Sequence, residues 1–131
     1  MKTKKILIDT SFLFIPVEFR IDIFVELERL FGSRVDLKII SPVLDELTLL
    51  MSSKSSKLRK KAHLTMEFAR KCNLIRVQRI EGENVDDCLV REAVKTKYPV
   101  ATCDKELRKQ LRALNIPVVY LRQKLRVQLE G

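Results

Sequence analysis

The feature that most constrains the fold is residues 6–9, where three aliphatic residues run directly into an aspartate near the start of the chain. Ile6, Leu7 and Ile8 are apolar and two of them are β-branched, which is typical of a strand buried on both faces. In an open α/β sheet, ligands bind beyond the carboxyl ends of the strands, where the strand order reverses. Asp9 is therefore predicted to lie at the rim of a binding site.

Strand-like and helix-like segments alternate along the rest of the chain. Four further short strands are predicted, at residues 37–40, 74–77, 98–103 and 118–121. Apolar residues at helical spacing indicate helices between them, with N-terminal caps at Ser41, Asn84 and Asp104. The order β-α-β-α-α-β-α-β-α-β favours an α/β fold with a parallel sheet covered by helices on both faces.

The composition limits the class of protein. With 131 residues and a hydrophobic share of 46%, the sequence suits one domain, residues 1–131, and a net charge of +9 predicts an acidic partner, most often nucleic acid. We find no targeting segment and no apolar run that could span a bilayer, so no membrane partner is expected. Three cysteines without a CxxC pair argue against a disulfide framework or a zinc site. A cytoplasmic protein is expected.

Acidic residues are placed by the predicted topology at one edge of the sheet. Asp9 and Asp104 follow strand ends, and Glu46 and Asp87 lie in the first turns of helices that follow strands. Carboxylates gathered closely repel one another unless a cation joins them. Mg²⁺ and Mn²⁺ favour such oxygen ligands and can activate a water against a phosphodiester. We therefore predict a metal-dependent catalytic site of Asp9, Glu46, Asp87 and Asp104, with Asp86 as an optional fifth ligand.

Each of these acids has a structural explanation when it is taken alone. Asp104 could cap its helix, and the helix dipole could favour Asp86 and Asp87 in a first turn. Glu46 could lie on an exposed face, although its helix is apolar over most of its surface and is expected to be deeply packed. Asp9 is the hardest to explain, because nothing structural requires an aspartate after that strand. These separate structural roles do not explain why all four acids are predicted at the same edge of the sheet.

Positive charge gathers in two segments. One enters the helix predicted after residue 57, and the other is the helix that follows Asp104. A solvated helix face and a phosphate-binding face are both open interpretations of such a run. The expected RNA-binding residues are Lys54, Lys57, Arg59, Lys60 and Lys61 in the first basic segment, and Lys105, Arg108, Lys109 and Arg112 in the second.

The segments around these acids resemble the PIN domain family of metal-dependent ribonucleases. The matching motifs stand in family order at residues 7–11, 43–47, 85–90 and 101–107. The resemblance implies a three-layer α/β/α sandwich with a central parallel sheet of four to five strands. It also implies that Mg²⁺ or Mn²⁺ is bound by Asp9, Glu46, Asp87 and Asp104, with support from Thr10, Ser11 or Thr102. Ser11 stands where many members carry asparagine, so its reach is shorter.

Within the family, residues 86–90 and 100–104 most resemble the nucleases that process small-subunit ribosomal RNA, in the form of an archaeal single-domain relative. We therefore expect an endoribonuclease acting on ribosomal RNA or its precursor. A VapC-type toxin ribonuclease and a non-catalytic RNA-binding component of ribosome assembly are the alternatives. A phosphotransfer receiver fits less well, because Arg122 and Lys124 are poor matches to the lysine that such proteins place after the last strand.

Some residues outside the site also carry predictions. Phe12, Phe14 and Phe19 follow the first strand and are candidates for the buried surface of a homodimer. The single histidine, His63, is predicted to lie at the surface without a catalytic role. The cysteines are interpreted as small buried hydrophobic residues, at Cys72, Cys88 and Cys103.

Overall fold

The structure, a computed structural model, describes residues 3–122 and 126–131, so Lys124 lies outside the described residues. The strands are β1 (Thr3–Ile8), β2 (Arg34–Ile40), β3 (Asn73–Ile75), β4 (Val100–Ala101), β5 (Val118–Arg122) and β6 (Arg126–Glu130). The helices are α1 (Thr10–Leu13), α2 (Ile15–Phe19), α3 (Ile23–Phe31), α4 (Ser41–Leu50), α5 (Ser56–Ala69), α6 (Val85–Thr96) and α7 (Lys105–Ala113).

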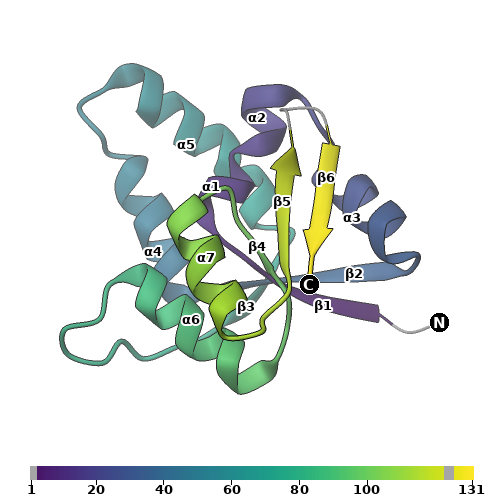
Figure 1. The fold of residues 1–131 in the computed structure, drawn as a ribbon. Coiled ribbons are helices and arrows are strands. Elements are labelled where there is room, and N and C mark those ends of the chain that lie inside the picture. The colour runs from purple at the N-terminus through teal and green to yellow at the C-terminus, as the bar shows by residue number, and fades with distance from the viewer. Residues whose placement is uncertain (1–2, 123–125) are drawn as a thin grey trace.

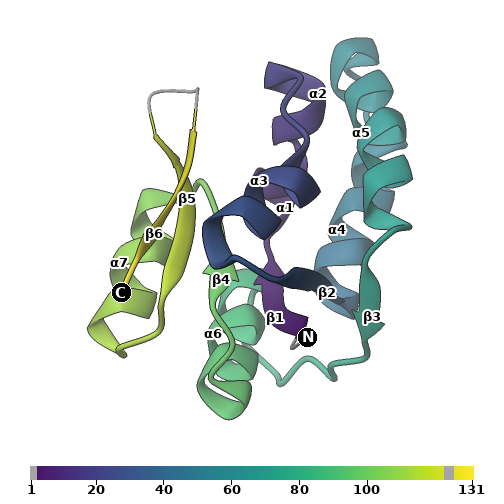
Figure 2. The same cartoon turned by 90° about the vertical axis from the view of Figure 1, so that its right-hand side faces the viewer.

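The strands form one sheet in the order β3-β2-β1-β4-β5-β6. Helix α3 lies on one side of the sheet, and α4, α6 and α7 lie on the other (Figures 1 and 2). The predicted α/β sandwich is therefore confirmed. The sheet is larger than the four to five parallel strands expected, because β6 adds an antiparallel sixth strand beside β5. Val127 and Leu129 alternate with polar residues in this strand, and this weak signal is typical of an edge strand.

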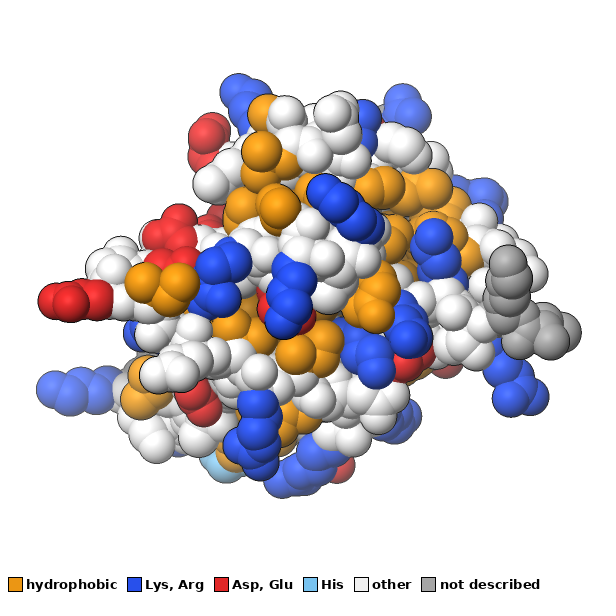
Figure 3. Space-filling view, turned by 90° about the horizontal axis from the view of Figure 1, so that it is seen from below, with side chains coloured by type: hydrophobic (Ala, Val, Ile, Leu, Met, Phe, Trp, Pro, Cys, Tyr) orange, Lys and Arg blue, Asp and Glu red, His pale blue; other side chains and the backbone are white. Residues whose placement is uncertain are grey.

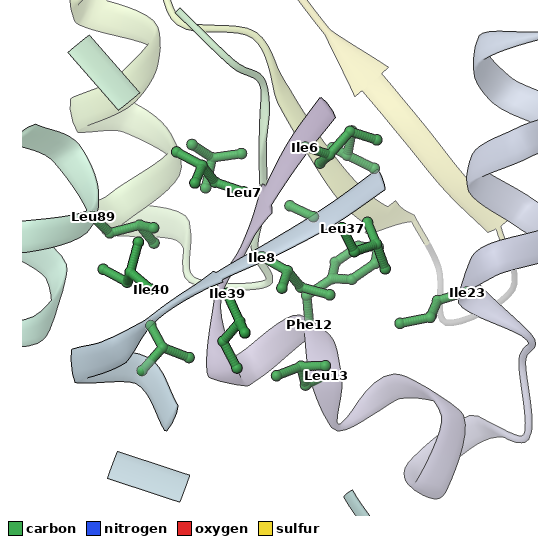
Figure 4. Packing of buried hydrophobic residues seen from close by; sticks show 14 of the residues in the cluster. Ile6, Leu7, Ile8, Phe12, Leu13, Ile23, Leu37, Ile39, Ile40 and Leu89 are labelled. Atoms are coloured by element: carbon green, nitrogen blue, oxygen red, sulfur yellow. The ribbon is translucent and has the colours of Figure 1, made fainter. Parts of the chain in front are cut away.

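The core is built on both faces of β1, as the apolar run at its end predicts. Leu7 points to the side where Ile40 and Leu89 lie, whereas Ile6 and Phe12 lie on the opposite side (Figure 4). All five of these side chains are fully buried. Because burying a large aliphatic or aromatic side chain stabilises a fold by about 1.5–3 kcal/mol, the end of β1 is strongly fixed in the middle of the sheet.

The strand order reverses beside β1. The chain adds β2 and β3 on one side of β1, then crosses over and adds β4 and β5 on the other side. In the parallel register, Ile8 pairs with Ala101, so the next residues, Asp9 and Thr102, lie side by side where both strands end. We call the edge where the parallel strands end the carboxyl edge. Asp9 therefore lies at the crevice where α/β sheets bind ligands, as predicted.

Local structure differs from the prediction at the start of α4. Ser41 is the first helical residue and not the cap, and its hydroxyl instead bonds the backbone of Val77, accepting from N at 2.9 Å and donating to O at 3.2 Å. The helix is also less deeply packed than its apolar residues suggested, because the side chain of Leu49 is 76% exposed. Asn84 and Asp104 cap α6 and α7 as predicted.

The residues expected to form a homodimer surface are mostly used inside the protomer. Phe12 is fully buried because α1 begins directly after Asp9 and turns this ring into the core, so its predicted role at an interface is wrong. Phe14 and Phe19 are half-buried against the core.

The cysteines and the histidine are only partly as predicted. Cys88 is buried, Cys72 is half-buried and Cys103 is exposed, so the interpretation as buried hydrophobic residues holds only for Cys88. All three thiols are free. His63 is exposed on α5, as predicted. Within residues 3–122 and 126–131, no helix has the length and apolar character needed to cross a membrane.

Candidate metal centre

Asp9 is buried at the carboxyl edge and is held by two hydroxyl groups. Its Oδ2 atom accepts hydrogen bonds from Ser11 Oγ at 2.7 Å and from Thr102 Oγ1 at 2.9 Å. The same two hydroxyls accept from backbone N–H groups of Cys103 at 2.9 Å and Asp104 at 3.1 Å. Each hydroxyl has one proton, and both protons are directed at Oδ2. The other oxygen, Oδ1, is therefore the atom of this carboxylate that is left for a ligand.

Glu46 is brought to the same place by Thr10. The Thr10 hydroxyl donates to Glu46 Oε1 at 2.6 Å, which links the first turn of α1 to α4 across 36 residues. Thr10 is buried and Glu46 is half-buried, so this hydrogen bond is partly shielded from water and orients the Glu46 carboxylate. The three hydroxyl residues that the family resemblance suggested as supports, Thr10, Ser11 and Thr102, all hold acidic side chains.

Asp104 has a structural role that leaves half of its carboxylate available. Its Oδ1 atom accepts from the backbone N–H groups of Glu106 at 2.9 Å and Leu107 at 3.1 Å, which caps α7. The alternative explanation of Asp104 as a helix cap is therefore correct. It does not exclude a role in ligand binding, because Oδ2 is not used by the cap.

The two neighbouring aspartates of α6 have different roles. Asp87 forms a capping box with Asn84, in which Asp87 Oδ2 accepts from Asn84 N at 3.1 Å and Asn84 Oδ1 accepts from Asp87 N at 2.8 Å. Burial and the charges of Asp9, Asp104 and Glu46 raise the pKa of Asp86 to about 6, with Asp87 contributing last.

The metal-binding role of Asp87 stays a prediction, because its capping box uses only Oδ2 and leaves Oδ1 for a ligand, as the cap of α7 does for Asp104. Asp86 is a further candidate ligand, because burial and the charges of the neighbouring acids raise its pKa. The spacing of Asn84 and Asp87, a cap followed by an acid three residues later, is the sequence signal of the capping box. We call Asp9, Glu46, Asp86 and Asp104 the carboxylate cluster.

The carboxylate cluster suits a hard divalent cation. Its donors are all oxygens, and the charges of the neighbouring acids add to burial in raising the pKa of Asp86. Among the described residues, no three His, Cys, Asp or Glu side chains already stand close enough to enclose a metal ion. Mg²⁺ does not need such an enclosure, because it keeps several waters and is commonly bound through one or two carboxylates. The residues present therefore fit an ion of this kind.

The first basic segment is mostly exposed. Lys61 is the exception, because it is half-buried, forms an ion pair with Glu18 and lies 4.4 Å from the centre of the Phe14 ring. The other residues of the segment are exposed, at Lys54, Lys57, Arg59 and Lys60.

The second basic segment is partly neutralised. Arg108 and Arg112 both pair with Glu130 of β6, and the Arg108 guanidinium lies 3.6 Å from the centre of the Tyr120 ring. Lys105 and Lys109 are exposed. Glu18 and Glu130 were not expected as partners, because these contacts join elements that are distant in the sequence.

The two basic segments lie on different sides of the carboxyl edge. Helices α5 and α7 are separated, with α1 between them (Figures 1 and 2). On the face seen from below, Lys and Arg side chains are scattered between hydrophobic and uncharged surface and form no single patch (Figure 3). This distribution suits loose contacts along a phosphate backbone better than one strong anion site.

Comparisons with known proteins show which family and which folds the chain is similar to. Residues 6–124 match the family described as PIN like domain. Ribonuclease VapC4 of Methanocaldococcus jannaschii is 31% identical over 128 residues, which cover 97% of each chain. The solved structure of the PIN domain endonuclease Utp24 is similar with a TM-score of 0.80 and 25% identity, covering 96% of this chain and 90% of its own. A domain of a functionally unknown M. jannaschii protein has a TM-score of 0.67, 16% identity and 91% coverage of each chain, a likeness of fold alone.

Proposed function

The chain belongs to the PIN-like domain family, and on this premise we propose that it is a metal-dependent endoribonuclease that hydrolyses RNA phosphodiester bonds. The observation that carries the proposal is the buried Asp9 carboxylate. One of its oxygens is fixed by two hydroxyls, and the other is left at the carboxyl edge, where burial and further acids raise the pKa of Asp86 to about 6. The chain has a net charge of +9, so acids gathered at one place are unusual in it. Their mutual repulsion is relieved when a cation binds between them.

Each residue of the site has a role in this proposal. The carboxylate cluster holds Mg²⁺ or Mn²⁺, which when bound lowers the pKa of a water and neutralises charge on the phosphodiester. Ser11 and Thr102 keep Asp9 in one orientation, and Thr10 does the same for Glu46. Asp87 acts as a positioning residue, because its capping box fixes the first turn of α6 on which Asp86 stands.

The substrate we propose is ribosomal RNA or its precursor, in the cytoplasm. Supporting this are the motifs at residues 86–90 and 100–104, the basic surface, and the likeness to the PIN domain endonuclease Utp24. A VapC-type toxin ribonuclease is the second candidate, and the observation that favours it is the 31% identity to ribonuclease VapC4 along nearly the whole of both chains.

The catalytic proposal is tested by sequencing the RNA ends left after incubation with purified protein. Wild type is expected to cut in Mg²⁺ or Mn²⁺ and to stop in excess chelator, and Asp9→Asn is expected to abolish cutting. The matched control is Glu67→Gln, an exposed acid on α5 whose one ion-pair partner among the described residues is Arg70, and it is expected to cut like wild type. Cutting by Asp9→Asn at the wild-type rate would overturn the proposal, and RNA binding without any cutting by wild type would favour a non-catalytic RNA-binding role.

Expression in cells distinguishes between the two proposed substrate classes. Expression of a ribosomal RNA processing enzyme is expected to leave new ends in ribosomal RNA without stopping growth. A toxin is expected to stop growth and to leave new ends in transfer or messenger RNA. The Asp9→Asn variant serves as the control in both experiments, because effects that persist in it do not come from cutting.

A further inference from the structure

We propose that the cleft between α4 and residues 77–85 binds the RNA base next to the scissile phosphate, and that Asp45 and Arg79 select guanine in it. The proposal rests on the proposed function, since it takes the carboxylate cluster as the place of cleavage. It adds a site that determines base specificity, which cleavage at the carboxylate cluster does not itself require.

The cleft is adjacent to the carboxylate cluster and has the right size and lining for a base. Its volume is about 380 Å³, and Glu46 belongs both to its wall and to the cluster. Apolar side chains line both sides, namely Pro42 and Leu49 from α4 and Val77 and Val85 from the opposite segment. Single-stranded RNA is read by proteins through bases that leave the stack and insert between side chains. A nucleotide bound with its phosphate near Glu46 has this cleft within reach of its base.

The cleft is held in shape before RNA arrives, although residues 76–84 contain neither helix nor strand. On the α4 side, the Ser41 hydroxyl makes both of its hydrogen bonds to the backbone of Val77. On the α6 side, Arg91 Nη2 donates to Gln78 O at 2.8 Å, and Arg91 also pairs with Glu83 at 2.9 Å. A preformed cleft loses little conformational entropy on binding, so it can discriminate between ligands.

The charges of the cleft match one base best. Asp45 stands on the α4 side and Arg79 on the opposite side, and neither has an ion-pair partner among residues 3–122 and 126–131. Guanine offers two donors, N1–H and the 2-amino group, on one edge and two acceptors, O6 and N7, on another. A carboxylate accepts from the first edge, and a guanidinium donates to the second in the commonest specific arginine–base contact. Cytosine, adenine and uracil present fewer of these groups to such a pair.

The binding arm of the test needs no cleavage. Affinity of wild type for short RNAs is measured in chelator, with one guanine replaced in turn by inosine, which lacks only the 2-amino group. Wild type is expected to bind the guanine RNA about fivefold or more tightly than the inosine RNA. Asp45→Asn is expected to lose this difference, and Glu67→Gln is expected to keep it. Equal binding of the two RNAs by wild type, or an unchanged difference in Asp45→Asn, overturns the proposal.

The cleavage arm uses a random-sequence RNA and the sequences of its cut ends. Guanine is expected to be enriched at one position beside the cut for wild type, and Asp45→Asn and Arg79→Gln are expected to reduce this enrichment while still cutting RNA. The control Arg70→Gln, which removes a comparable exposed arginine from the C-terminal cap of α5, is expected to keep it. Cutting without guanine enrichment overturns the base-reading proposal and leaves the nuclease standing. Absence of cutting by wild type overturns the proposed nuclease activity. The binding measurements then still show whether the cleft selects guanine.

Discussion

At the scale of single residues, Asp86 gives the sharpest pH dependence. Its pKa of about 6 in the folded chain lies above its ordinary value of 3.8, so folding disfavours its ionised form. This penalty is absent below about pH 4, grows as pH rises to about 6 and is constant above that. We expect Asp86→Asn to stabilise the metal-free protein near neutral pH by about 1 to 2 kcal/mol, because partial exposure reduces the full effect of the shift. The measurement is the urea midpoint at acid and neutral pH.

The neighbouring variant Asp87→Asn is the matched control. It removes a carboxylate from the same turn, but it weakens the capping box and is expected to destabilise the protein by about 0.5–2 kcal/mol at neutral pH. Added Mg²⁺ is expected to raise the Tm of wild type and of Asp87→Asn more than that of Asp86→Asn. If Asp87→Asn is the variant that stabilises the metal-free protein, the roles assigned to these two residues are exchanged.

Thr102 and Thr65 form a second matched pair. Thr102→Val removes a donor to Asp9 and the acceptor of Asp104 N–H, so we expect a loss of about 1–3 kcal/mol in the free energy of unfolding and weaker metal binding. Thr65→Val replaces a buried hydroxyl that has no hydrogen-bond partner in the described part of the chain, and it is expected to be neutral or stabilising. Calorimetry measures both effects. Equal destabilisation by the two variants would show that the Thr102 hydroxyl has no special role.

The site could be predicted from the sequence as far as position along the chain decides it. Asp9 and Asp104 follow strand ends, and strand ends are visible in an apolar pattern. The choice between Asp86 and Asp87 depends on which side chain turns back to the backbone, and adjacent residues share the same pattern. The pairing of Thr10 with Glu46 depends on the packing of α1 against α4, and no local pattern records that contact.

At the scale of elements, α5 contains two adjacent lysines in different environments. Lys60 is exposed, whereas Lys61 is held by Glu18 and by the ring of Phe14. We expect Lys60→Ala to reduce the slope of log affinity for single-stranded RNA against log salt concentration by about 0.7, the value for one phosphate contact. Lys61→Ala is expected to change the slope less. Equal changes, or no change for either, would mean that this helix face does not follow the RNA backbone.

The elements that could be predicted are those in which apolar residues recur at a regular helical or strand spacing. The helices with alternating apolar and charged faces begin within a few residues of the predicted positions, and α7 begins where Asp104 places it. β4 is only Val100–Ala101, although the apolar run is longer, because strand pairing and not hydrophobicity sets the ends of a strand. β6 was missed because Val127 is the only one of its residues that is buried, which leaves a weak pattern in a basic segment.

At the scale of the whole molecule, homodimer formation stays a prediction. Phe14 and Phe19 are its remaining apolar candidates, since Phe12 belongs to the core. We expect light scattering to give about twice the chain mass of 15.3 kDa at micromolar concentration, and Phe19→Ala to shift the protein towards the monomer. The circular dichroism of the variant should match that of wild type. A wild-type mass of 15.3 kDa throughout the concentration series would contradict the prediction.

The hydrogen bonds around Asp9 have a consequence for the protein during its own synthesis. Thr102 is 93 residues away from Asp9 along the chain, and Cys103 is 92 residues away from Ser11. A nascent chain that has left the ribosome only as far as α6 has neither β4 beside β1 nor the second hydroxyl on Asp9. Because a domain folds as a unit, the candidate metal centre is completed only after residues 102 and 103 have left the ribosome. We therefore expect a nascent chain from which Thr102 has not yet emerged to be unable to cut RNA at the proposed site.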